Sequence, residues 1–298
     1  MPRTLLLAVL AVVACAAARP AACAAASLPL EVEVRAREFA PGEPVRITVR
    51  APEPLVSARG RFGGREIRLA PEDGRTPSAS WTGWSLVGLD DPPGPAIIEI
   101  TGRTAGGRAA AGARAVTVAA REFPVEHLTV AAKYVEPPAD VAARLARERA
   151  ALDAVYARTS PPPPDLGPFV PPVPGPPTST FGKRRVFNGK PRAPHPGLDL
   201  RAAEGDTVRS AGAGTVVWAG ELYYSGNTVI VDHGLGLFTI YAHLSRIDVR
   251  EGQPVRAGER LGLAGATGRV TGPHLHFGAK IGREPFDPRA LYDPSLFD

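Results

Sequence analysis

Short stretches in which apolar and polar residues alternate fill the first part of the chain. Between Leu28 and about Val130 they are LEVEVRA, PVRITVRA, AIIEITG and ARAVTVAA, and turn clusters such as APGEP and DDPPGP separate them. A period of two is typical of β-strands that bury one face. Several such strands within about 100 residues are typical of a sandwich. We therefore predict an immunoglobulin-like β-sandwich over residues 28–130, with Trp81 and Trp84 in its core rather than in a sugar-binding pair.

A helical pattern and then a proline-rich stretch follow this sandwich. Between Ala139 and Arg158, Leu145, Leu152 and Val155 recur at helical spacing among Ala, Arg and Glu residues, which predicts one amphipathic helix. The next segment, PPPPDLGPFVPPVPGPP, cannot form a helix or a central strand. It predicts a stiff, extended connector. We therefore place a helix and a Pro-rich linker over residues 131–177, with a domain boundary there.

The remaining stretch, residues 178–292, is rich in glycine and in strand patterns. TVRSA, GTVVWAG, NTVIVDHG, LFTIYAHLS, RLGLAG and HLHFGAKIG alternate with glycine-containing turns. This pattern predicts a compact antiparallel β domain. The 33 prolines and 32 glycines among 298 residues also favour turns and short strands over helical bundles. The predicted fold class is mostly β.

The N-terminus has the pattern of a targeting segment. Arg3 precedes an apolar run from Leu5 to Ala14, which is too short for a spanning helix of about 20 residues. We therefore expect residues 1–26 to be a cleaved signal peptide, and the mature protein to be exported to the periplasm or cell envelope. The only cysteines, Cys15 and Cys23, lie in this segment, so no disulfide is expected. Cys15 also fits a lipid anchor, whereas the small residues before Ser27 fit ordinary cleavage; both alternatives stay open.

The charge pattern adds little to this picture. The formal net charge is +5, yet no block of five or six basic residues occurs. A solvated, arginine-rich surface explains the charge, and weak attraction to anionic polymers is the alternative. We expect no nucleic-acid partner, and the sequence does not indicate an oligomeric state.

Histidines cluster in the last predicted domain, and this cluster is the candidate chemistry. Of six histidines, five lie there; they are His195, His233, His243, His274 and His276. Imidazole is both a common zinc ligand and a proton carrier near neutral pH. His127 stands apart, and we interpret it as a surface or hydrogen-bonded residue. His233, at a predicted strand end, is interpreted as a locally hydrogen-bonded histidine.

Two short motifs supply candidate metal ligands. His195 and Asp199 lie four residues apart in HPGLD, but Pro196 and Gly197 argue against a helix, so we expect a tight turn to present them. His274 and His276 lie two apart in HLH, and on a strand both rings would face the same side. One carboxylate and neutral imidazoles suit Zn²⁺.

The number of ligands suggests how the roles divide. A catalytic zinc keeps three protein ligands and leaves the fourth position for water, whereas a structural zinc fills all four. Two histidines and Asp199 make such an open site. One of His274 and His276 is then left, together with His243, for acid–base work and oxyanion stabilisation. These physical arguments do not decide which of the two histidines binds the metal.

The segments FGKRRVFNGKPRAPHPGLDL, SGNTVIVDHGLGLFTIYAHLS and GATGRVTGPHLHFG resemble the lysostaphin-type (LytM-like) zinc metalloendopeptidases, which cut peptidoglycan peptides. The resemblance covers about residues 178–292 and implies a small antiparallel β domain with a groove over one zinc ion. The implied zinc ligands are His195, Asp199 and His276, and the implied catalytic histidines are His243 and His274. Arg184 to Lys190 and Tyr223 to Asn227 are candidate groove walls.

The resemblance also sets the competing hypotheses for function. It implies a peptidoglycan endopeptidase whose N-terminal half is an accessory domain that positions or shields the catalytic unit. Some members of the family lack metal ligands and activate cell-wall amidases, so a catalytically silent activator or wall-binding protein is the alternative. Because none of the five expected positions departs from the family pattern, we favour the hydrolase.

Overall fold

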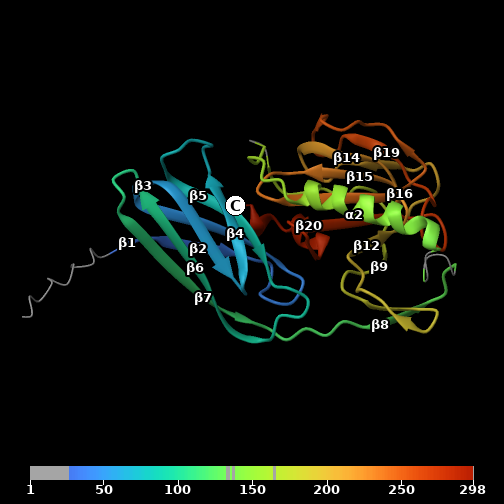
Figure 1. The fold of residues 1–298 in the computed structure, drawn as a ribbon, viewed down its shortest axis with the longest axis horizontal. Coiled ribbons are helices and arrows are strands. Elements are labelled where there is room, and N and C mark those ends of the chain that lie inside the picture. The colour runs from blue at the N-terminus through green and yellow to red at the C-terminus, as the bar shows by residue number, and fades with distance from the viewer. Residues whose placement is uncertain (1–26, 132–134, 136–137, 164–165, 298) are drawn as a thin grey trace, which may run out of the picture.

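The computed structural model describes residues 27–131, 135, 138–163 and 166–297. Figure 1 shows two β regions side by side, the first coloured blue to teal and the second yellow to red. The predicted signal peptide over residues 1–26, with Cys15, lies outside the described residues. Among the described residues, no helix combines the length and apolar character that crossing a bilayer requires.

One long strand organises the N-terminal β region. The strands of this region are β1 (Leu28–Pro29), β2 (Glu31–Arg35), β3 (Pro44–Phe62), β4 (Arg65–Pro71), β5 (Ser78–Leu86), β6 (Gly94–Thr104) and β7 (Ala109–Val118). The first half of β3 pairs with β2 and β5, and its second half pairs with β6 and the start of β4. The predicted β-strands are confirmed. The immunoglobulin-like arrangement is not confirmed, because these strands form one continuous hydrogen-bonded sheet.

The alternation seen in the sequence explains which side chains this sheet buries. In β3, Val45, Ile47 and Val49 are fully buried, and the polar residues between them are more exposed. Trp81 is buried in the core of this region, whereas Trp84 is buried in the core around the C-terminal sheet, so both are core residues but only Trp81 lies in the core predicted for it. Hydrophobic burial of alternate residues therefore stabilises this region.

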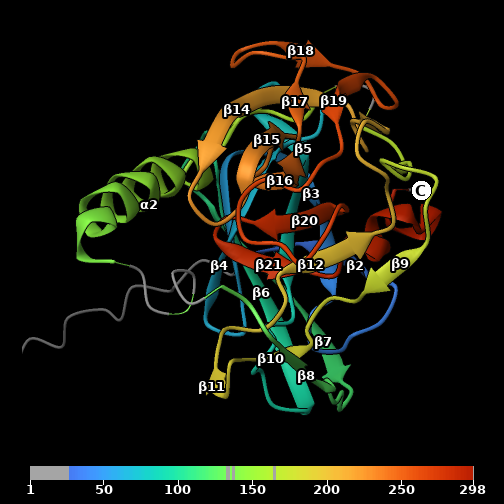
Figure 2. The same ribbon diagram turned by 90° about the vertical axis from the view of Figure 1, so that its right-hand side faces the viewer.

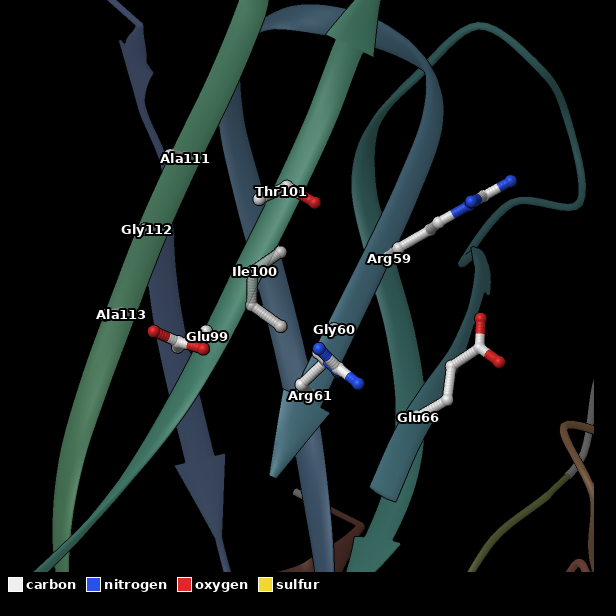
Figure 3. Close-up of a pocket in the computed structure, with 10 residues that line it drawn as sticks. All are labelled: Arg59, Gly60, Arg61, Glu66, Glu99, Ile100, Thr101, Ala111, Gly112 and Ala113. Atoms are coloured by element: carbon white, nitrogen blue, oxygen red, sulfur yellow. The ribbon is translucent and has the colours of Figure 1, made fainter. Parts of the chain in front are cut away.

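A hollow of about 750 Å³ lies on the N-terminal β region (Figure 3). Its charged residues, Arg59, Arg61, Glu66 and Glu99, are exposed and balance one another in sign. No histidine lies among the residues that line it. The hollow thus has volume without a concentration of reactive groups.

Helix and strands then build the C-terminal part of the fold. Its elements are β8 (Val125–Leu128), η1 (Ala139–Val141), α2 (Ala142–Tyr156), β9 (Pro177–Ser179), β10 (Arg184–Phe187), β11 (Lys190–Pro191), β12 (Gly197–Leu200), β13 (Thr207–Arg209), β14 (Gly214–Leu222), β15 (Gly226–Asp232), β16 (Leu237–Leu244), β17 (Arg246–Ile247), β18 (Pro254–Val255), β19 (Arg260–Leu263), β20 (Leu275–Ile281), β21 (Glu284–Phe286), η2 (Pro288–Tyr292) and η3 (Pro294–Leu296). The predicted helix is confirmed.

The main C-terminal sheet has the antiparallel order β18-β14-β15-β16-β20-β12-β9. Figures 1 and 2 show α2 against one face of this sheet, where Val155 and Tyr156 pack on Ile230 and Phe238. The main hydrophobic core covers the other face. Because both faces are covered, strand β15 is almost entirely buried, and its apolar residues Val229, Ile230 and Val231 follow one another instead of alternating with polar ones.

The proline-rich segment lies against this core instead of standing free. Phe169 and Val173 are buried within it, and the Phe169 amide donates to the carbonyl oxygen of Leu291. The described part forms no helix or strand before β9, which lies at a sheet edge as a strand that begins with proline should. The predicted connector is therefore irregular, with bends at residues 172–175, and docked on the core. The domain boundary within it remains our proposal.

The two β regions share a packed and charged contact. Trp84 of β5 lies 5.9 Å from Phe297, measured between ring centroids. Arg37 bridges the fully buried Glu43 (2.6 Å) and Asp287 (3.2 Å), which follows β21. Apolar and ionic contacts together therefore hold the N-terminal β region against the C-terminal sheet.

Candidate metal centre

Two neighbouring strands bring an aspartate and a histidine into register. Asp199 of β12 pairs directly with His276 of β20. Gly197 allows this approach, because a Cβ there would lie only 2.4 Å from the carbonyl oxygen of Phe277. His195 precedes β12 in an extended segment rather than in the predicted tight turn. The spacing of four still works, because an even separation along an extended chain keeps two side chains on one face.

Three ligand atoms converge at this point. His195 Nε2 lies 3.0 Å from Asp199 Oδ1 and 3.1 Å from His276 Nδ1, and His276 Nδ1 lies 2.8 Å from Asp199 Oδ1. Ligand atoms around a tetrahedral zinc with bonds of about 2.0–2.2 Å stand about 3.3–3.6 Å apart. The three atoms thus need to open only slightly to fit that ion. Among the described residues, the group that could hold a metal ion comprises these three side chains.

The surrounding backbone fixes how three of the histidine rings are turned. In each, Nδ1 lies within hydrogen-bonding distance of a backbone carbonyl oxygen, to which it can donate. The pairs are His195 with Thr180 (3.0 Å), His243 with Thr267 (2.8 Å) and His274 with Gly272 (2.8 Å). An Nδ1–H held in this way leaves the Nε2 lone pair available. The sequence had named no such partners.

A bulge aims His243 at the same place. Between its pairings with Asn227 and Val229, strand β16 carries one extra residue. His243 lies there with φ of 66°, a left-handed conformation that is uncommon for a residue with a side chain. Its ring centroid lies 4.9 Å from that of His274 and 5.9 Å from that of His276. His274 Nε2 in turn lies 3.6 Å from Asp199 Oδ1.

Burial and local charge set the protonation of the cluster. Burial alone would raise the pKa of Asp199, but its close polar contacts with His195 and His276 hold it well below its usual range. Burial lowers the pKa of His195, against the effect of Asp199. Burial, with the neighbouring imidazoles, lowers the pKa of His243 to about 3. Ionised carboxylate and neutral imidazole are the forms that bind metal.

A pocket of about 140 Å³ opens over the cluster. Its lining residues are Leu128, Val130, Arg185, Phe187, Pro196, Asp199, Tyr224, Ser225, His243, Arg269, Val270, Thr271, His274 and His276. Both predicted groove walls contribute to it. The guanidinium of Arg269 lies 4.8 Å from the ring centroids of both Tyr224 and Phe187, which stiffens one side of the pocket.

Several contributors to this pocket were not predicted from the sequence. Arg185 donates from Nη2 to Asp199 Oδ2 at 3.1 Å, and the sequence offered only its place in a predicted wall. Leu128 and Val130 come from the segment after the N-terminal β region, about 65 to 70 residues before His195. No local pattern marks them, because only the tertiary fold brings them here.

The two histidines outside the cluster have other surroundings. His233 is fully buried, with Nδ1 2.6 Å from the carbonyl oxygen of Ala213 and Nε2 2.7 Å from the hydroxyl of Thr239. Burial lowers its pKa to about 4. His127 is exposed on β8. The structure thus brings five predicted residues together and leaves these two apart, as expected.

Comparisons with known proteins place this geometry in a family. The model of Peptidase family M23 matches residues 193–288, which include all five clustered residues. Peptidoglycan DD-endopeptidase ShyA of Vibrio cholerae is 46% identical over 101 residues, or 34% of this chain and 24% of that protein. DD-carboxypeptidase/endopeptidase Mpg of Neisseria meningitidis is 42% identical over 101 residues, with 34% and 23% covered. The chain thus spans about a quarter of the length of these curated relatives.

A solved structure extends the likeness beyond the matched segment. A crystal structure from Pseudomonas aeruginosa described as a peptidase M23 is 31% identical, with a TM-score of 0.63. The alignment covers 88% of this chain and 97% of that one. The shared architecture therefore includes the N-terminal β region as well as the histidine cluster. On this evidence the chain belongs to peptidase family M23.

Proposed function

We propose that this protein is a zinc-dependent endopeptidase that hydrolyses peptide bonds of peptidoglycan in the cell envelope. One observation carries the proposal: His195, Asp199 and His276 converge as metal ligands while two further imidazoles face the same pocket. Three protein ligands are the number typical of a catalytic zinc, which keeps a position open. His276 is assigned to the metal because its Nδ1 lies within about 3 Å of both other ligand atoms.

The assignment gives each remaining side chain a task. When bound, zinc supplies Lewis-acid polarisation of a carbonyl group and lowers the pKa of a coordinated water to about 7. His243 and His274 hold Nδ1 on backbone carbonyls, so each presents Nε2 to a substrate in the pocket. There they can accept and return a proton and donate a hydrogen bond to an oxyanion.

The names of the relatives support the substrate class. ShyA is named a peptidoglycan DD-endopeptidase, and Mpg a DD-carboxypeptidase/endopeptidase. We infer that this chain also acts on peptidoglycan peptides, with cross-links of the DD type as the first candidate. Such a substrate places the mature protein outside the cytoplasm, consistent with the predicted signal peptide.

A silent activator of amidases is not favoured. That role would not require three ligand atoms, an orienting guanidinium and carbonyl-held imidazoles around one pocket. Each of these features is present here.

The test combines metal analysis with digestion of purified sacculi. We expect about one zinc ion per chain, and mass spectrometry of the released fragments should show newly cleaved peptide bonds. Sacculi of defined cross-link type would identify the bond, and a chelator should abolish its cleavage. Protein that binds no zinc and cuts no peptide, yet stimulates an amidase, would instead establish the activator.

A further inference from the structure

A strand from between the two β regions forms one edge of the metal site. β8 follows the N-terminal β region and pairs in parallel with β10, with Glu126 opposite Arg185 and Leu128 opposite Phe187. In Figure 1 the green chain after β7 crosses to the C-terminal region and reaches β8 there. This strand lies outside the segment matched by the family model. Alternation turns Glu126 and Leu128 inward and leaves Val125 and His127 exposed.

The inward carboxylate of Glu126 meets three polar side chains. Its Oε1 lies 2.8 Å from Lys183 Nζ and accepts from Ser179 Oγ at 3.2 Å, and its Oε2 lies 3.5 Å from Arg185 Nε. Burial alone would raise the pKa of this carboxyl, but Lys183 and Arg185 lower it below its usual range. Glu126 is therefore an ionised group held between two cations.

Two of these partners reach the metal ligands. Arg185 Nη2 binds Asp199 Oδ2, which leaves Oδ1 as the atom that faces His195 and His276. Ser179 Oγ lies 3.4 Å from His195 Nδ1. Arg185 Nε is buried and has no hydrogen-bond partner among the described residues, so Glu126 at 3.5 Å supplies its opposing charge. The two carboxylates thus share one guanidinium.

We propose that Glu126 is a positioning residue of the metal centre, which acts through Arg185 on the orientation and charge of Asp199. With Glu126 present, Arg185 divides its charge between two carboxylates. Without it, the whole guanidinium charge falls on Asp199 and competes with the metal ion for that carboxylate. The inference rests on the proposed function, and it makes a strand outside the segment matched by the family model part of the site.

The first experiment measures zinc affinity in the full chain. Glu126→Gln keeps the shape of the side chain and removes its charge. Loss of a partner in the outer shell of a metal site typically costs about 10–100-fold in affinity. We expect the zinc dissociation constant, measured by competition with a chelator, to rise by about that factor. Glu122→Gln removes the same charge from an exposed glutamate four residues earlier, and should leave zinc affinity unchanged.

A double-mutant cycle separates positioning from a general structural effect. Arg185→Lys keeps a cation but loses the planar group that links the two carboxylates. If Glu126 acts through Arg185, Glu126→Gln should change zinc affinity less than threefold in the Arg185→Lys background. Additive effects of the two substitutions would overturn the proposal. Glu126→Asp, which retains the charge, should recover part of the affinity and of the visible spectrum of the Co²⁺-substituted protein.

Kinetics provide an independent outcome. Glu126 does not line the pocket, so with a soluble peptidoglycan peptide kcat should fall in Glu126→Gln while KM stays the same. If wild-type protein binds zinc and cleaves the peptide, and Glu126→Gln has the same zinc affinity, this inference is refuted and the proposed function stays intact. Wild-type protein without zinc binding would refute both.

Discussion

The two β regions of this protein use similar strands but place their polar groups differently. The hollow on the N-terminal region is the larger, at about 750 Å³ against about 140 Å³, and its charges lie exposed on β3, β4 and β6. In the C-terminal pocket, imidazoles and a carboxylate are buried or half-buried, and their ring nitrogens are held by backbone carbonyls. A candidate reactive site is therefore recognised by side chains that converge in fixed orientations, and not by the volume of a hollow.

The comparison also shows that the regions are not independent in space. The core around the main C-terminal sheet includes Trp84 and Leu86 of the N-terminal region. β8 carries Glu126 and Leu128 to the metal site. The region without reactive groups can thus support the region that has them, and the predictions below probe how far that division extends.

The largest expected effect comes from removing a metal ligand. His276→Ala deletes one of the three converging atoms, so both zinc content and peptide cleavage should be lost, with activity lower by more than about 1,000-fold. Zinc is measured by elemental analysis and cleavage by fragment release from sacculi. The matched control His127→Ala removes an exposed histidine of β8 and should keep both. Cleavage at the wild-type rate by His276→Ala would exclude it as a ligand.

The next effect separates the two kinds of histidine in the pocket. His274→Ala removes an imidazole whose Nε2 lies 3.6 Å from Asp199 but which does not belong to the group of three ligands. Zinc should remain bound while kcat falls by about 100- to 10,000-fold, the usual contribution of general acid–base catalysis. Loss of zinc comparable to that in His276→Ala would exchange the roles of these two residues.

These two predictions depend on residues that the sequence had already marked. The five clustered residues were predictable because HPGLD and HLH are local motifs in a histidine-rich domain. The period of two was foreseen for HLH only, whereas the tight turn expected for HPGLD was wrong. Spacing alone could not decide whether His274 or His276 binds the metal. It depends on the register of β12 with β20, which only the folded sheet sets.

Some features of the fold could likewise be predicted from the sequence, and others could not. Strand positions and the helix followed from the patterns of apolar and polar residues. The pairing of β8 with β10 could not be predicted, because two strands more than 50 residues apart pair through tertiary contacts that no local pattern encodes. For this reason Glu126, the ionic partner of Arg185, was also missed.

A third prediction concerns the ionic contact between the regions. Glu43 is fully buried between Arg37 and Arg121, so Glu43→Ala leaves two half-buried guanidinium groups without it. The free energy of unfolding should fall by about 3 kcal/mol, the cost typical of breaking a buried ion pair.

Denaturant titration checks this value against an exposed pair. Glu53→Ala removes the partner of Arg108 on the surface and should cost less than about 1 kcal/mol. Zinc affinity of folded Glu43→Ala should be unchanged, since none of its contacts reaches the pocket. A stability loss no larger than that of Glu53→Ala would mean that the buried ion pairs of Glu43 contribute no more than an exposed pair.

The smallest expected effect concerns the stability contribution of Lys280, which lies at the far end of the sheet face that carries the metal site. Alternation along β20 puts Lys280 on the same face as His276, but beneath α2, where its Nζ lies 4.3 Å from the ring centroid of Tyr156. Burial lowers the pKa of Lys280 from 10.5 to about 8, against the charge of Asp153. The unfolded chain therefore binds this proton more tightly than the folded chain does.

The sign of the pH dependence follows from that difference. Below pH of about 8 both states are protonated, and the folded state bears the full cost of a half-buried cation. Between pH of about 8 and about 10.5 the folded state is the first to lose the proton, so this cost declines and stability rises. Lys280→Met should remove this rise and be more stable than wild type by about 2 kcal/mol at pH 7 but not at pH 10.5. Denaturant titrations of the metal-free proteins measure this difference in stability. Lys190→Met, at an exposed lysine, is the control for loss of one cation. If the difference between Lys280→Met and wild type is the same at both pH values, Lys280 keeps its ordinary pKa under the helix.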